Sequence, residues 1–208
     1  RLVWSRDASH FRIMPGATHK ATDLESVARL LGLANQHGYP VTFRSGGSSL
    51  SGQTVGHGVV VDTRSGFQSL ISIGEDSITA QPGVTLARLN GHLSRRGRKV
   101  GPDPASMVAS TLGGAVSNNS SGMTCGTELN SYRTIRSAKI AFAEGQILDT
   151  SAADADSQLR ALRPDIYKLL ETKRDQIRSN RAHQQKIRHL FRLKNTMGYS
   201  LNAFLDFD

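Results

Sequence analysis

The sequence has very little cysteine and no long apolar run, and each absence excludes a class of protein. Cys125 is the single cysteine among 208 residues, which rules out an intrachain disulfide framework. An iron–sulfur cluster or a zinc site built from this chain alone is excluded for want of thiolates, so we expect no metal ligands here. No stretch approaches the roughly 18 apolar residues of a membrane span, and no basic-then-apolar leader is present. We expect a soluble, cytoplasmic chain. It opens without a methionine, and we expect it to be a piece of a longer protein.

Acidic residues are also scarce, but only in one region. The formal charge is +9, and residues 160–194 alone hold seven Arg and four Lys against three acidic residues, a net charge of +8. A uniformly basic nucleic-acid-binding domain would not concentrate its charge in this way. Tyr167 and Phe191 are the only aromatic residues in that region, too few for base stacking. A solvated helical face is the expected meaning, and a nucleic-acid-binding module is kept as an alternative.

Local patterns predict an α+β fold with short strands rather than a regular βαβ repeat. A capping box at Thr22 and Glu25 predicts a helix that ends near Gly38, and Thr85 predicts the cap of a second helix that ends at Gly97. Strands are predicted at 41–43, 59–61, 70–73 and 77–81, and a hairpin at 137–142 and 146–149. Residues 154–193 are predicted to be helical, with a break near Asn180.

A loop without bulky side chains joins the first two predicted strands. Glycines free its backbone, and its hydroxyls and successive N–H groups can converge on one anion. The candidate binding residues are Arg44, Ser45, Gly46, Gly47, Ser48, Ser49, Leu50, Ser51 and Gln53. Neither G-x-G-x-x-G before a helix nor a P-loop G-K-[ST] is present. The loop is predicted to cradle a phosphate or pyrophosphate, and a flexible surface turn is the alternative.

A second stretch, residues 101–127, is made almost entirely of small residues and has no charge after Asp103. Such a segment lets either another backbone or a flat ligand approach closely. The candidate residues are Pro102, Asp103, Thr111, Gly113, Gly114, Asn119, Ser121, Gly122, Met123, Gly126 and Thr127.

Taken together, the two stretches resemble the FAD-linked oxidases of the vanillyl-alcohol oxidase type, which carry a PCMH-type FAD-binding domain. The first loop is similar to their pyrophosphate loop, R-G-G-G-T-S-L-S-G. Pro102 to Pro104, T-L-G-G from Thr111 and N-S-S-G from Asn119 follow in the order found in D-lactate dehydrogenases and glycolate oxidase subunits. Ser45, Ser48, Ser120 and Ser121 depart from that pattern. K-N-T-M-G-Y, residues 194–199, resembles the branch that is fused to an iron–sulfur domain.

The resemblance implies a fold and a domain division. Residues 1–150 would form a PCMH-type FAD-binding domain, with a first α+β subdomain at about 15–100 and the start of a second at about 101–150. Residues 151–193 would be a basic helical insertion, and residues 194–208 would return to the FAD domain. Residues 45–49 would bind the pyrophosphate, Ser51 and Gln53 would steady the loop, and Pro102 and Asp103 would pass beside the ring. No histidine lies among the candidate loop residues 44–53 that could attach the flavin, so FAD would be held non-covalently.

The resemblance also implies an activity, the oxidation of a D-2-hydroxy acid such as D-lactate, glycolate or D-2-hydroxyglutarate by hydride transfer to FAD. In relatives the catalytic base and the carboxylate-binding arginines come from a later cap domain, so no catalytic residue is assigned in this chain. An aldonolactone oxidase or an alkyl-glycerone-phosphate synthase on the same fold is the alternative enzyme. The basic insertion could contact a fused iron–sulfur domain or the inner face of a membrane, and the electron acceptor stays open.

Overall fold

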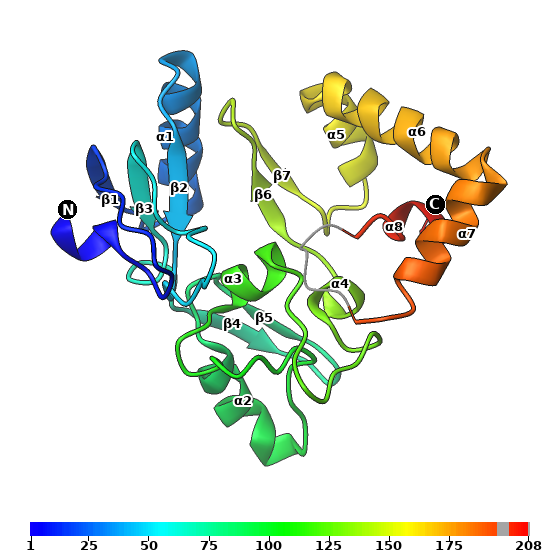
Figure 1. Ribbon diagram of the computed structural model, residues 1–208, viewed down its shortest axis with the longest axis horizontal. Coiled ribbons are helices and arrows are strands. Elements are labelled where there is room, and N and C mark those ends of the chain that lie inside the picture. Colours follow the sequence, from blue (N-terminus) through cyan, green and yellow to red (C-terminus); the bar gives the residue numbers. More distant parts are fainter. Residues whose placement is uncertain (195–199, 208) are drawn as a thin grey trace.

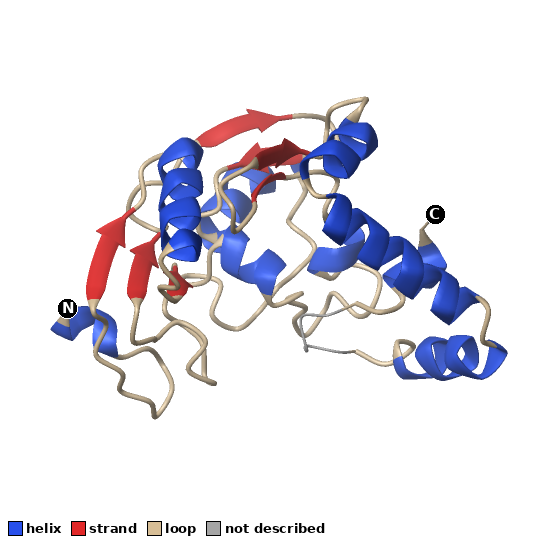
Figure 2. Cartoon of the chain, turned by 90° about the horizontal axis from the view of Figure 1, so that it is seen from above, coloured by secondary structure: helices blue, strands red, loops and turns tan. Residues whose placement is uncertain are grey.

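Figure 1 shows three groups of elements side by side: a parallel sheet with one helix, a hairpin with another helix, and a helical arm at the C-terminal end. The structure is a computed structural model and describes residues 1–194 and 200–207. In the view from above, the N-terminus and the helical arm lie at opposite ends of the molecule (Figure 2). The predicted α+β class is confirmed.

The N-terminal group is a three-stranded parallel sheet with β3 in its centre. After a 3-10 turn at Leu2–Ser5, its elements are β1 (Ala17–Lys20), α1 (Leu24–Gln36), β2 (Val41–Arg44) and β3 (Val59–Asp62). α1 packs on the sheet through a core that includes Val27, Val61 and Phe67. β2 and β3 run parallel, so the loop between them must return along the whole strand. Both strands were predicted; β1 was not, because its sequence Ala-Thr-His-Lys carries no apolar alternation.

The predicted N-cap of the first helix is wrong by one residue. Asp23, not Thr22, is the N-cap, and its Oδ1 accepts the N–H of Ser26 at 2.6 Å. The Thr22 hydroxyl donates instead to the Asp23 carboxylate at 2.8 Å. A carboxylate is favoured there because it interacts with the positive end of the helix dipole. Glu25 therefore occupies the second helical position, and no capping box forms.

The second group has its own small core. Its elements are β4 (Leu70–Ile73), which pairs antiparallel with β5 (Ile78–Ala80), α2 (Leu86–Leu93) and a 3-10 turn (Ser94–Arg96). Thr85 caps α2 as predicted, because its side chain accepts the N–H of Arg88. Leu86 and Leu89 are fully buried and pack with Val84 and Ala115.

Two short helices and a hairpin come between the second and third groups in the sequence. They are α3 (Leu112–Ser117), α4 (Ser131–Thr134), and the strands β6 (Lys139–Ala141) and β7 (Ile147–Asp149). The helical arm consists of α5 (Ala155–Leu162), α6 (Pro164–Arg178) and α7 (Arg181–Leu190), and α8 (Ala203–Asp206) packs on α6. Asn180 lies at the predicted break and caps α7 through the N–H of His183. Within the described ranges, no helix combines the length and the apolar character needed to cross a membrane.

Candidate cofactor-binding site

The two glycine-rich stretches are in direct contact. The Oγ atom of Ser45 lies 2.7 Å from the Oγ1 atom of Thr111, across 66 residues of chain. Gly46 approaches the second stretch so closely that an added Cβ would lie 2.1 Å from the carbonyl oxygen of Ala109. Only glycine fits at such a distance. The structure thus brings the start of the first stretch against residues 109–111 of the second, beside the C-terminal end of β2.

Serine hydroxyls hold the first loop in shape. The Ser49 Oγ accepts the N–H groups of Ser51 and Gln53 at 3.2 and 3.3 Å and donates to the Gln53 amide oxygen at 3.0 Å. The Ser48 Oγ lies 3.4 Å from the Oγ of Ser110. Leu50, at the tip, is 77% exposed. Ser49 and Gln53 therefore steady the loop, and Ser51 takes part through its backbone.

Ser110, which contacts the first loop, and Ser106, which contacts Ser110, were both missed as candidates in the sequence. Ser110 lies next to Ser48 and also pairs with Ser106, with 2.6 Å between the two Oγ atoms. The signal that could have identified them is the pair of serines four residues apart just before Thr111. Residues at that spacing share one side of a helical turn.

Each glycine-rich stretch contains a run of backbone N–H groups that is left open. Among the described residues, no acceptor is present for the N–H groups of residues 46–50, nor for those of residues 121–123. Backbone N–H groups are strong donors and are usually paired with protein, water or ligand. Successive open N–H groups in a loop form a concave anion site. The arrangement can therefore accept negatively charged oxygens at two places.

Arg44 packs against the first loop and the N-terminal segment. Its guanidinium group lies 5.2 Å from the ring centroid of Trp4 and donates to the carbonyl oxygen of Arg6. A Cβ on Gly47 would lie 2.8 Å from it. Burial lowers the pKa of Arg44, and the carboxylates of Asp7 and Asp62 oppose that shift. Its positive charge is therefore shared with these acidic groups.

Gly113 and Gly114 lie inside α3, which Thr111 caps. The N–H of Gly113 donates to the carbonyl oxygen of Pro82 at 2.8 Å, and the N–H of Gly114 donates to the Thr111 Oγ1 at 3.4 Å. Thr111 is fully buried. Neither N–H group is therefore open to a ligand, because one is bonded to Pro82 outside the helix and the other to the cap of α3. The two glycines can still form a low wall, because they carry no side chain.

The turn at residues 119–124 closes the second stretch. Asn119 is buried in a left-handed conformation, with φ of 45°. Its side-chain oxygen accepts the N–H of Tyr132 at 2.9 Å, and its amide donates to the Ser200 Oγ at 3.0 Å. The Ser121 Oγ is buried and has no hydrogen-bond partner within the described residues, a cost of about 1–3 kcal/mol unless a bound molecule supplies a partner. Asn119 thus shapes the turn, while Ser121 has unused hydrogen-bonding capacity.

Asp103 anchors the other side of this turn, next to the buried Pro102. Its N–H donates to the Ser121 carbonyl at 3.1 Å, and its carboxylate accepts the N–H and the hydroxyl of Thr124. The Thr124 hydroxyl, helped by the Lys99 ammonium group 3.8 Å away, lowers the pKa of Asp103 even though burial opposes the shift. The carboxylate is therefore ionised and already compensated.

Gly126 and Thr127 lie in the next turn, which the N–H of Leu129 closes on the carbonyl of Cys125 at 3.0 Å. Within the described part of the chain, neither residue hydrogen-bonds to the first loop. Met123 and Val108, also in the second stretch, are 94% and 79% exposed. Apolar side chains beside open N–H groups fit a ligand with both a flat apolar ring and phosphates, as in a dinucleotide. Residues 195–199 of the predicted K-N-T-M-G-Y motif lie outside the described residues.

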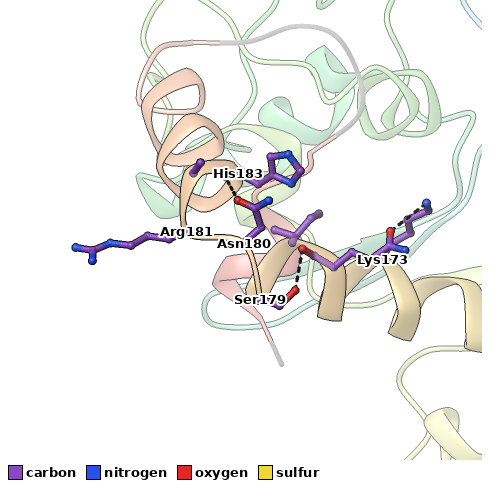
Figure 3. A pocket seen from close by; sticks show the side chains of 8 residues that line it. Lys173, Ser179, Asn180, Arg181 and His183 are labelled. Atoms are coloured by element: carbon purple, nitrogen blue, oxygen red, sulfur yellow. Dashed lines mark hydrogen bonds between the residues drawn. The ribbon is translucent and has the colours of Figure 1, made fainter.

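Two hollows lie elsewhere. One, of about 720 Å³, lies between α6 and α7 (Figure 3), and one of about 390 Å³ lies between α1 and the β6–β7 turn. In the first hollow, Figure 3 shows that Arg181 points away from Lys173 and His183. The side-chain oxygen of Asn180 already accepts the N–H of His183 as the cap of α7. The positive charges around this hollow do not converge, so the glycine-rich contact remains the better candidate site.

Comparisons with known proteins agree with this geometry. A family described as FAD binding domain matches residues 15–151. The chain is 32% identical over 127 residues to glycolate oxidase subunit GlcD of Bacillus subtilis, covering 59% of this chain and 27% of the relative. It is 27% identical over 197 residues to D-2-hydroxyglutarate dehydrogenase of Haemophilus influenzae, covering 91% and 18%. The chain thus spans only about a fifth to a quarter of the length of these relatives.

A solved structure of alkyldihydroxyacetonephosphate synthase in P1 is similar with a TM-score of 0.53 and 22% identity, covering 65% of this chain and 27% of that one. This likeness concerns the fold alone. The predicted PCMH-type fold and the FAD cofactor are confirmed by the family match, which includes both glycine-rich stretches. Because the match extends over more than half of the 208 residues, the chain belongs to the FAD-binding domain family.

Proposed function

We propose that this chain is the FAD-binding part of a longer flavoprotein that oxidises a D-2-hydroxy acid, such as D-lactate, glycolate or D-2-hydroxyglutarate. The observation that carries the proposal is the contact between Ser45 and Thr111, which joins the two glycine-rich stretches that hold the open N–H groups. The names of the two relatives supply the substrate class. When bound, FAD supplies the hydride acceptor for the oxidation of the acid.

The residues divide into two roles. The N–H groups of residues 46–50 bind the pyrophosphate, whose two charges need donors in a partly dry site. Those of residues 121–123 meet the polar edge of the ring, where negative charge collects on reduction. Thr111, Gly113 and Gly114 form a low wall, with Pro102 and Asp103 beside it. FAD is held non-covalently, because no histidine lies among the binding residues 44–53 of the first loop.

The chain supplies cofactor binding, and the rest of the protein supplies the catalytic base. We propose a FAD unit at residues 1–150, a basic insertion at 151–193 and a return to the FAD unit from residue 194. The compartment is the cytoplasm. The basic insertion is available for contact with a fused iron–sulfur domain or with the inner face of a membrane.

The test is an absorbance spectrum of the full-length protein, purified without added cofactor. We expect flavin bands at about 370 and 450 nm that bleach when D-lactate, glycolate or D-2-hydroxyglutarate is added without oxygen. The L-enantiomers of the chiral acids are the matched control and should bleach the bands far more slowly. Flavin that none of the acids reduces would overturn the substrate class and favour another reaction on this fold. A protein that holds no flavin after reconstitution would overturn the binding roles.

A further inference from the structure

The first residue after the basic insertion contacts the proposed ring-binding turn. Lys194 follows α7, and its ammonium group donates to the carbonyl oxygen of Gly122. Residues 180–194 contain no acidic side chain. Within residues 1–194 and 200–207, Lys194 forms no ion pair with a carboxylate. Its positive charge is therefore bound to a neutral carbonyl and is not cancelled.

Gly122 also packs closely against Asp103. An added Cβ on Gly122 would lie 1.9 Å from the Asp103 Oδ1 and 2.3 Å from the Asp103 carbonyl oxygen. The backbone of the turn is therefore pressed against Asp103, whose charge is compensated by Thr124 and Lys99. Gly122 thus contacts both a compensated carboxylate and an uncompensated ammonium group.

The bond from Lys194 also acts on the next donor. The carbonyl of Gly122 and the N–H of Met123 belong to the same peptide group, so a cation on the oxygen polarises the N–H and strengthens it as a donor. That N–H has no acceptor among the described residues. Lys194 can therefore act on a ligand in two ways, through its own field and through the Met123 N–H.

We propose that Lys194 is a positioning residue of the flavin site. It holds the turn at residues 121–123 against the ring, and its charge favours the reduced flavin, on which negative charge accumulates. The inference rests on the proposed binding roles, and it ties the helical insertion to the redox behaviour of the cofactor. It assigns no part in proton transfer to Lys194.

The test compares three variants of the full-length protein: Lys194→Met, Lys194→Arg and, as control, Lys186→Met. Lys186 is an exposed cation on α7, so its loss makes the same change in net charge away from the turn. FAD affinity is measured by titration, and the reduction equilibrium is measured against a redox dye, without any hydroxy acid. We expect Lys194→Met to shift that equilibrium about tenfold towards oxidised flavin. Lys194→Arg should stay near the wild type, and Lys186→Met should shift it less than about twofold.

A shift in Lys194→Met no larger than in Lys186→Met would overturn the inference. Weaker FAD binding with an unchanged reduction equilibrium would also overturn it, because that pattern marks a purely structural contact. The redox dye replaces the hydroxy-acid substrate in this measurement. If no hydroxy acid reduced the flavin, the proposed function would be wrong, but the effect of Lys194 on the reduction equilibrium could still be measured. A protein without flavin would overturn both.

Discussion

The glycine-rich contact and the helical insertion are stabilised in different ways. In the contact, hydroxyl and backbone hydrogen bonds join segments that carry few charges, and those charges are compensated, as at Arg44 and Asp103. In the insertion, Arg163 pairs with Asp165 and Glu144 at the start of α6, while the arginines of α7 face solvent. The comparison teaches that the overall charge of +9 does not mark the binding site. We expect the cofactor phosphates to be bound by backbone N–H groups.

Tyr132 on α4 joins the two regions. Its hydroxyl donates to the Asp206 carboxylate at 3.0 Å, and its ring packs edge-on against Phe207 at 5.7 Å. Arg133 forms an ion pair of 3.1 Å with the same carboxylate. Asn119 reaches Ser200 in the same C-terminal segment, so the turn of the cofactor site and α8 share one network. Four substitutions in the full-length protein test how far the regions are separate.

The largest effect is expected from Gly46→Ala. Its Cβ would lie 2.1 Å from the Ala109 carbonyl, so the two stretches must move apart. We expect the FAD dissociation constant, measured by fluorescence titration, to rise at least about 100-fold, or about 2.7 kcal/mol. The control is Gly91→Ala in α2, where a Cβ meets nothing within 4 Å. That change should leave FAD binding intact and stabilise the helix by up to about 1 kcal/mol. Equal FAD affinity in both variants would contradict a site at this contact.

Next is Thr111→Val, matched with Thr85→Val. Both threonines cap helices through their side chains, and only Thr111 also bonds to the first loop. Each variant should lose about 1–2 kcal/mol of unfolding free energy in urea, because a cap is removed. Only Thr111→Val should also weaken FAD binding, by about tenfold. If Thr85→Val weakened it equally, the loss would reflect general destabilisation.

Tyr132→Phe tests the link between α4 and α8 through the pH dependence of the unfolding free energy. Burial, together with the bond to Asp206, raises the pKa of Tyr132 from 10.0 to about 12. The unfolded chain therefore loses this proton at a lower pH than the folded chain, and stability falls as pH rises between about 10 and 12. The variant should lack that part of the fall and should lose about 1 kcal/mol at neutral pH. Urea unfolding across the pH range measures both effects.

The control for Tyr132→Phe is Tyr39→Phe, since Tyr39 is 66% exposed. It should leave stability at neutral pH within about 0.5 kcal/mol. A Tyr132→Phe protein with the full alkaline loss of the wild type would show that other groups cause it.

The smallest effect is expected from Arg188→Gln on the exposed face of α7. The unfolding free energy should change by less than about 0.5 kcal/mol, and FAD affinity should stay at the wild-type value. The comparison is Arg133→Gln, which breaks the ion pair with Asp206 and should cost up to about 1 kcal/mol. A loss of FAD affinity in Arg188→Gln would mean that charge in the insertion does reach the cofactor.

Local chemistry made much of the fold predictable. Thr85 caps α2 as predicted, Asn180 lies at the predicted break between two helices, and the hairpin turns at Gly145, between the two predicted strands. These features depend on hydrogen bonds between residues a few positions apart. The cap of α1 was misassigned because Thr22 and Asp23 are both good N-cap residues, and the carboxylate was the one used.

The sequence by itself determined the family, the two glycine-rich stretches and the local helix and strand pattern. Each of these depends on the types and spacing of residues that are close together in the sequence. Only the tertiary structure decided that β3 lies between β1 and β2, that Ser45 meets Thr111, and that Lys194 returns to Gly122. Such contacts join residues tens of positions apart. They depend on how apolar faces pack into two small cores, which no local pattern specifies.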